Sequence, residues 1–204
     1  MQGGTLPEME QIILASQSPR RKELFTQLGL PFVCFSPELD ESFQPGADPF
    51  DVVRDLAIRK VKKAADSAPE QPPLWVCGAD TLVHCAGITL GKPGSRAEAK
   101  TMLGQLQGKT HRVVTAVALY SGRTGFTDCR SDASEVTFAG MDDAEMEWYL
   151  DTGEWKDAAG GYKVQGLASC FITKINGSYS NVVGLPLHLL YVMLRDNGYP
   201  YGGL

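Results

Sequence analysis

The sequence is poor in the residues that build disulfide frameworks, metal-thiolate sites and histidine-based catalytic sites. Its 204 residues include five cysteines and three histidines. The cysteines are odd in number and widely spaced, and none forms a Cys-x-x-Cys pair, which excludes a zinc ribbon and a dithiol redox site. His84, His111 and His188 lie in unrelated contexts and predict neither a nucleophilic triad nor a histidine metal site. We therefore expect reduced thiols, most of them in a core.

An excess of positive charge and long apolar runs are also missing from the sequence. The formal net charge of -5 argues against a general nucleic-acid-binding protein, although a local basic cleft can still hold a polyanion. Apolar runs fall well short of the roughly 20 residues that span a bilayer. Residues 1–11 lack the basic-then-apolar pattern of a signal peptide. These features predict a cytoplasmic protein with no membrane association and no stable nucleic-acid partner.

Helical and extended patterns alternate along the chain, which predicts an α/β protein. With 43% hydrophobic residues the chain can bury a full core, and we expect residues 1–204 to form one domain. The Asn176-Gly177 pair predicts a hairpin between strands over 171–175 and 178–183. Further strands are expected over 11–15, 32–36, 74–78, 112–120 and 134–139, and helices are expected to open at Pro19, Asp48-Pro49, Ser95, Asp142 and Pro186.

A short segment, Ala15 to Arg21, combines two hydroxyls with two guanidinium groups where the first strand passes into a helix. Ser18 is the expected N-cap and Pro19 the first helical residue, so orphan backbone N–H groups face the turn. Arg20 and Arg21 add planar forks that bind phosphate oxygens in pairs. Two interpretations remain open here: a phosphate site, or a capped surface helix whose arginines face water.

A carboxylate follows the third expected strand, in Gly78-Ala79-Asp80-Thr81. Asp80 is therefore expected at a strand end, where α/β sheets place ligands. A carboxylate there can activate water or hold Mg²⁺, which favours one or two carboxylates together with phosphates and waters. Asp40 and Glu41, in an acidic loop, are candidates to help. The alternative is that Asp80 caps a tight turn.

Two lysines and a glutamine complete the candidates. Lys92 stands in a Gly-Lys-Pro turn, and Lys60 lies on a helix, where most lysines stay in solvent. Gln165 lies between glycines in residues 160–166, where its amide can read a base edge because it offers both a donor and an acceptor. A turn followed by a strand is the alternative for this segment.

Taken in order, five motifs resemble the Maf family of nucleoside triphosphate pyrophosphatases. They are Ala15-Ser16-Gln17-Ser18-Pro19-Arg20-Arg21, Gly78-Ala79-Asp80-Thr81, Leu90-Gly91-Lys92-Pro93, Gly161-Tyr162-Lys163-Val164-Gln165-Gly166 and Asn181-Val182-Val183-Gly184-Leu185-Pro186. The resemblance implies a Maf/ITPase-like fold, in which a mixed twisted sheet with flanking helices forms two lobes around a deep cleft. It also implies a homodimer that hydrolyses nucleoside triphosphates between the α- and β-phosphates, with Mg²⁺ or Mn²⁺.

The Gln165 setting is similar to the branch acting on dTTP and UTP rather than the branch associated with 7-methyl-GTP. The resemblance implies that Asp80 is the general base. It implies specificity positions at Arg20, Thr81 and Gln165, polar and basic cleft positions at Ser16, Arg21, Lys60 and Lys92, and a metal site drawn from Asp40, Glu41 and Asp80.

One departure from the family pattern keeps another function open. Ala158 stands where many relatives carry a lysine before the Tyr-x-x-Gln motif, so a positive charge is missing. A nucleotide-binding regulatory protein with weak or lost catalysis is therefore an alternative, as is a 7-methyl-GTP pyrophosphatase. Metal-dependent release of pyrophosphate separates an enzyme from a binding protein.

Overall fold

A seven-stranded mixed sheet forms the centre of the protein. The computed structural model describes residues 8–35, 38–44, 46–68 and 73–201; residue 36 of an expected strand and residues 1–7 of the N-terminal segment lie outside this part. The strand order is β2-β1-β3-β5-β6-β7, with β4 paired to β3. The strands are β1 (Ile12–Leu14), β2 (Phe32–Cys34), β3 (Trp75–Cys85), β4 (Ile88–Leu90), β5 (Thr110–Ser121), β6 (Phe126–Phe138) and β7 (Ile172–Asn176). Only the pairs that β1 forms, with β2 and with β3, are parallel among these strands.

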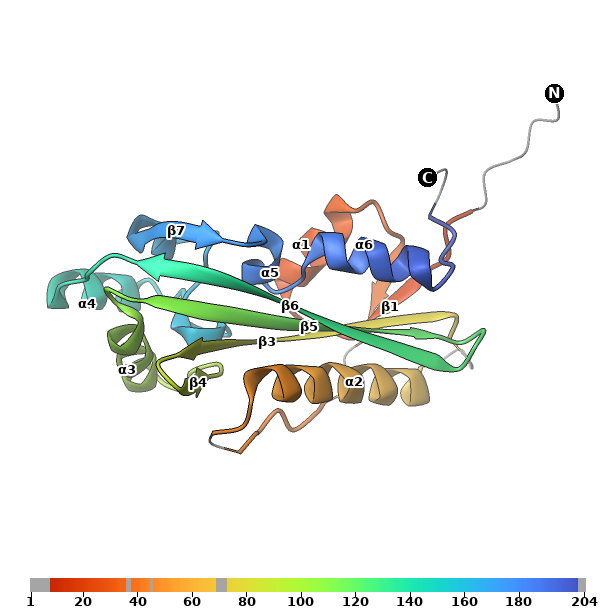
Figure 1. Ribbon diagram of the computed structural model, residues 1–204, viewed down its shortest axis with the longest axis horizontal. Coiled ribbons are helices and arrows are strands. Elements are labelled where there is room, and N and C mark those ends of the chain that lie inside the picture. The colour runs from red at the N-terminus through yellow and green to blue at the C-terminus, as the bar shows by residue number, and fades with distance from the viewer. Residues whose placement is uncertain (1–7, 36–37, 45, 69–72, 202–204) are drawn as a thin grey trace, which may run out of the picture.

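Helices cover both faces of this sheet and confirm the mixed α/β fold. They are α1 (Pro19–Gln27), α2 (Pro49–Ser67), α3 (Arg96–Leu106), α4 (Asp143–Asp151), α5 (Tyr179–Val183) and α6 (Leu187–Asp196), with 3₁₀ turns η1 (Ala159–Gly161) and η2 (Leu167–Phe171). Figure 1 shows α2 along one face, α1 and α6 on the opposite face, and α3 and α4 near one end of the long strands.

The hydrophobic core consists of three clusters, and β5 contributes to each of them. Val113 belongs to the cluster beneath α3 and α4, Val117 and Leu119 to the cluster beneath α1 and α6, and Val114 and Ala116 to the cluster beneath α2. Residues spaced three and four apart on α2 fill the last cluster, as expected for an amphipathic helix on a sheet.

Helix caps follow the sequence closely. Asp142 and Glu145 form a complete capping box at α4. At α3 the box is shifted by one residue, because Ser95 accepts from the Glu98 N–H while the Glu98 carboxylate accepts from the Gly94 N–H. The first turns of these helices are therefore fixed by local side chains.

The predicted Asn176-Gly177 hairpin is wrong. β7 ends at Asn176, and Ser178 then caps α5 by accepting from the Asn181 N–H. Gly177 has φ 124°, and a Cβ there would lie 2.6 Å from Ser134 Oγ. Close packing against β6 therefore requires this glycine, whereas the sequence pattern indicated a two-residue turn.

Two expected strands are much longer than their sequence patterns indicated. β3 continues through Asp80 to Cys85, so Asp80 lies within the strand, opposite Ala116 of β5, and not at its end. β6 begins at Phe126 because it pairs along the whole length of β5. Long-range pairing thus extends strands through polar residues that local patterns treat as ends.

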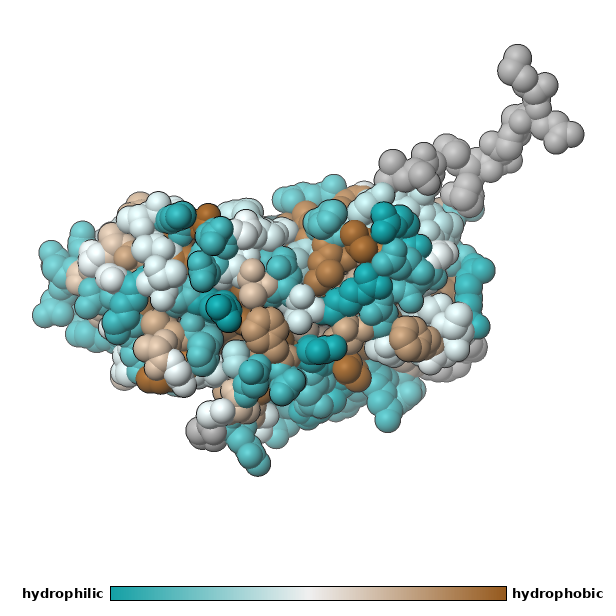
Figure 2. Space-filling view, in the orientation of Figure 1, coloured by the Kyte–Doolittle hydropathy of each residue, from teal (hydrophilic) through white to brown (hydrophobic). Residues whose placement is uncertain are grey.

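The face of the molecule seen in Figure 2 is mostly polar. Figure 2 shows that hydrophilic side chains cover most of one face, with short apolar patches, one of them over α6. Within the described residues, no helix has both the length and the apolar character needed to cross a membrane.

Candidate functional site

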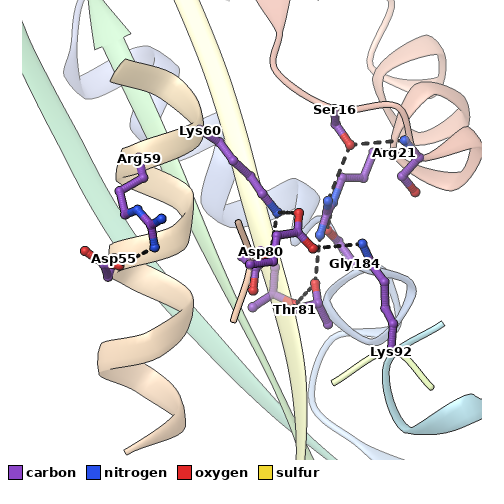
Figure 3. A network of polar contacts seen from close by, with 12 residues as sticks. Ser16, Arg21, Asp55, Arg59, Lys60, Asp80, Thr81, Lys92 and Gly184 are labelled. Carbon is purple, nitrogen blue, oxygen red and sulfur yellow. Dashed lines mark hydrogen bonds and ion pairs between the residues drawn. The ribbon is translucent and has the colours of Figure 1, made fainter. Parts of the chain in front are cut away.

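Arg21, in the first turn of α1, is the centre of a polar network. Its Nε donates to Gly184 O at 2.8 Å, while its terminal nitrogens donate to Thr81 Oγ1 at 3.1 Å and to Ser16 Oγ at 3.4 Å. Ser18 is the N-cap residue of α1, as predicted. Its side chain accepts no hydrogen bond from the helix, and its own backbone N–H donates to Ser16 Oγ. Figure 3 shows the guanidinium between these hydroxyls. Arg21 therefore faces the interior, and burial lowers its pKa.

Two carboxylates share one ammonium group next to this network. Lys60 Nζ lies 2.6 Å from Asp80 Oδ1 and 2.7 Å from Glu41 Oε1, and Lys92 Nζ lies 3.0 Å from Glu41 Oε2. Lys60 and Asp80 are 9% and 5% exposed. Lys60 is thus buried, unlike most helix lysines, because Gly78 leaves room for α2 to approach β3 closely.

The acidic loop supplies one carboxylate to the cluster and holds the other locally. Burial alone would raise the pKa of Glu41, but the ammonium groups of Lys60 and Lys92 outweigh burial and lower that pKa to about 2. Asp40 accepts from the Ser42 N–H and hydroxyl at 2.9 and 3.0 Å, and these bonds lower its pKa. Glu41 is thus ionised within the site, while both oxygens of Asp40 have a local partner.

The chemistry of these donors fits a divalent cation that arrives with a ligand. Within the described residues, no group of three or more metal-ligating side chains converges. Asp80 and Glu41, however, both contact the same Lys60 nitrogen and so lie near one another. Mg²⁺ is commonly bound by one or two carboxylates and completes its shell with phosphate oxygens and water. These two carboxylates match that requirement.

Arg20 connects α1 to the segment that carries the glutamine candidate. Its guanidinium donates to Asp157 O at 2.8 Å. The next residue, Ala158, is buried, and Gly160 N–H donates to Gly91 O at 2.9 Å beside Lys92. Of the alternative of a turn followed by a strand, the turn is present at Gln165, but the 3₁₀ turn η2 and not a strand follows it directly. Gln165 is exposed.

Three adjoining hollows collect all of the predicted site residues. The first, of about 840 Å³, is lined by Ser16, Arg20, Arg21, Asp40, Glu41, Lys60 and Lys92. The second, of about 550 Å³, adds Asp80 and Thr81, and the third, of about 40 Å³, adds Gln165. Lys92 lines all three, so the hollows adjoin one another, and we refer to them together as the cleft. The first is the most charged, and the third is lined mainly by apolar side chains, such as Val83 and Val113.

The structure adds Thr115 and the backbone of Asn181 to the residues selected from the sequence. Thr115 Oγ1 lies 3.0 Å from Thr81 Oγ1 and donates to Asn181 O at 3.0 Å. In the sequence, Thr115 stands out only as a polar residue within an apolar strand, Val113 to Val117. This pattern does not show which residue its hydroxyl contacts.

Comparisons with known proteins show what the chain as a whole is similar to. A family model described as Maf-like protein matches residues 11–197. A relative named dTTP/UTP pyrophosphatase from Symbiobacterium thermophilum is 45% identical, with 94% of this chain and 96% of the relative covered. One of the same name from Geobacter metallireducens is 40% identical, with coverages of 95% and 99%. The solved Staphylococcus aureus Ham1 protein is 15% identical with a TM-score of 0.50, over 92% of this chain and 100% of that one, and supports the fold alone.

Proposed function

The chain belongs to the Maf family, and from this premise we propose that it is a nucleoside triphosphate pyrophosphatase acting on dTTP and UTP. The products are the nucleoside monophosphate and pyrophosphate. The relatives named dTTP/UTP pyrophosphatase support the choice of substrates. The observation that carries the proposal is the contact of Asp80 and Glu41 with Lys60 at the edge of a cleft lined by arginines.

The charges of the first hollow suit a triphosphate. Arg20, Arg21, Lys60 and Lys92 line it, and α1 directs its N-terminal backbone N–H groups toward the same region. Preorganised cations stabilise the charge that builds on a leaving pyrophosphate. We assign this role to Arg20, Arg21 and Lys92, because Lys60 is buried between two carboxylates, whereas Lys92 contacts only Glu41 among the described carboxylates and is half exposed.

Asp80 is the proposed general base. It accepts a proton from the water that attacks the α-phosphorus, and Lys60 holds its Oδ1 in place at 2.6 Å. Glu41 and Asp80 would hold a divalent cation, Mg²⁺ or Mn²⁺, which would supply positive charge opposite the phosphate oxygens. Asp40 lines the first hollow together with Glu41 and remains a prediction as a third metal-binding residue.

Arg20, Thr81 and Gln165 are the proposed specificity residues. Thr81 and Gln165 both line the third hollow, and Thr81 also lines the adjoining second hollow, whose volume of about 550 Å³ leaves room for a base. We further propose that residues 1–204 act as one domain, as a homodimer in the cytoplasm, without a stable nucleic-acid partner.

Release of pyrophosphate from dTTP, UTP, CTP, GTP and 7-methyl-GTP, with Mg²⁺ or Mn²⁺, tests this function. We expect release from dTTP and UTP, and a ~10²–10⁴-fold loss of turnover in Asp80→Asn, since base catalysis contributes about that much. Asp55→Asn is the matched control, because Asp55 is an exposed residue of α2 that pairs with Arg59. Unchanged turnover in Asp80→Asn would remove Asp80 from the chemistry. Release confined to 7-methyl-GTP would overturn the substrate assignment, and no release at all would favour a binding protein.

A further inference from the structure

A chain of hydrogen bonds runs from the cleft into the sheet at Thr81. Thr81 on β3 and Thr115 on β5 are directly paired across the strands, and their hydroxyl oxygens lie 3.0 Å apart. Thr115, which is fully buried, lies 3.0 Å from Asn181 O. The Asn181 side chain is itself fixed, because its amide donates to Val113 O at 3.0 Å and Ser134 Oγ at 2.9 Å.

The direction of the protons along this chain follows from the chemistry of its end. A backbone carbonyl can only accept, so the single proton of Thr115 is directed to Asn181 O. The contact between the two threonines is then a hydrogen bond only if Thr81 donates. If Thr115 instead donated to Thr81, no proton would lie between Thr115 Oγ1 and Asn181 O, although these two oxygens are 3.0 Å apart. Arg21 can only donate, and its bond occupies one lone pair of Thr81. Thr81 therefore presents an acceptor to the cleft.

Ser16, on the other side of the same guanidinium, presents a hydrogen-bond donor to the cleft, whereas Thr81 presents an acceptor. Its Oγ accepts from the Ser18 N–H and from Arg21, so its proton is left to point into the charged hollow. A donor hydroxyl suits phosphate oxygens, which only accept. An acceptor hydroxyl at Thr81 suits an N–H group. The two hydroxyls thus orient a nucleotide, with its phosphates near Ser16 and its base near Thr81.

We propose that Thr115 is a positioning residue that holds the Thr81 hydroxyl as an acceptor, so that the site selects a base with a ring N–H. Uracil and thymine carry this hydrogen at N3, whereas N3 of cytosine is a bare acceptor that would face the Thr81 lone pair. Because Thr81 lines both the second and the third hollow, its hydroxyl selects for a ring N–H whichever of the two hollows the base enters. The inference rests on the proposed function, and it attributes the preference for uracil and thymine over cytosine to the buried residue Thr115.

Titration calorimetry with non-hydrolysable α,β-methylene analogues of UTP and CTP tests the proposal. We expect the wild-type protein to bind the UTP analogue more tightly. Thr115→Val keeps the side-chain volume, removes the acceptor and frees the Thr81 proton to meet cytosine N3. The UTP-to-CTP affinity ratio should therefore fall about tenfold, the effect of one hydrogen bond. Thr115→Ser keeps the hydroxyl and should keep the ratio, while Ser16→Ala should weaken both analogues alike.

A folded Thr115→Val protein with the wild-type ratio would overturn the proposal, as would an equal fall in Thr115→Ser. If Thr115→Val does not fold, the N3-methyl derivative of the UTP analogue replaces it, because the methyl group removes the ring N–H. Undiminished binding of that derivative to the wild-type protein would overturn the proposal. Equal binding of UTP and CTP analogues, including no binding of either, would do the same. Selective binding without pyrophosphate release would instead refute only the proposed catalytic function.

Discussion

Replacement of Gly78 by alanine tests how the fold positions Lys60. Gly78 lies on β3 where α2 crosses closest to the sheet. A Cβ at this position would lie 2.9 Å from Val61 Cγ2, 3.3 Å from Ala57 O and 3.4 Å from Lys60 Cβ. Because ordinary contacts begin near 3.4 Å, Val61 must turn aside or α2 must move outward by about half an ångström. Either response alters the wall from which Lys60 reaches Asp80.

The expected effect has a structural and a catalytic part. Overpacking of this kind costs about 1–3 kcal/mol of unfolding free energy. For a chain of 204 residues, each kcal/mol lowers Tm by about 2–4 °C, so we expect a fall of about 2–12 °C. Displacement of α2 also lengthens the 2.6 Å contact between Lys60 and Asp80, so kcat should fall. Thermal unfolding followed by circular dichroism and pyrophosphate release measure the two parts.

Gly104→Ala is the matched control for this experiment. Gly104 lies within α3, and among the described residues outside its chain neighbours and the backbone of the same helix, no atom lies within 4 Å of a Cβ at this position. The substitution removes the penalty of about 1 kcal/mol that glycine imposes on a helix, so Tm should rise and activity stay constant. If Gly78→Ala leaves both Tm and kcat at their wild-type values, the close approach of α2 is not what positions Lys60.

Two further predictions concern pH and base selectivity. His111 is buried, and burial lowers its pKa to about 4, so it folds as the neutral imidazole. The unfolded chain takes up a proton below pH 6.5, so the stability due to neutral His111 is complete above that pH and falls by about 3 kcal/mol toward pH 4. Denaturant unfolding should show a flatter pH profile in His111→Gln but not in His188→Gln, an exposed site; identical profiles would contradict this assignment. Gln165→Ala should reduce discrimination among UTP, dTTP and GTP more than it weakens triphosphate binding, and a uniform loss in kcat/KM for all three would argue against base recognition.

Sequence patterns predicted features that depend on neighbouring residues. The predicted starts of α4 at Asp142 and of α2 at Asp48 depend on bonds within one turn, and both are confirmed. The cleft residues from five separate motifs also come together as the family resemblance implied. The order of motifs was informative because four of them bring polar residues to the adjoining hollows, while the fifth brings the apolar Val182 and Val183.

Features decided by distant contacts could not be predicted in this way. The burial of Lys60 depends on the absence of a side chain at Gly78, 18 positions along the chain. The turn at Asn176-Gly177 depends on Ser134 of β6, which leaves no room for a Cβ. Thr115 gains its role only when β5 pairs with β3. In each case packing between elements outweighs the local preference of the residue.

The participation of β5 in all three hydrophobic clusters has a consequence for cooperativity. Val113, Val114 and Val117 fix successive parts of one continuous strand in three different packing environments. A cluster cannot melt without loosening a strand on which the other two depend, so partial unfolding of one region is energetically linked to the rest. Slow hydrogen exchange should therefore extend along β5 beneath all three clusters, and thermal unfolding should proceed as one transition.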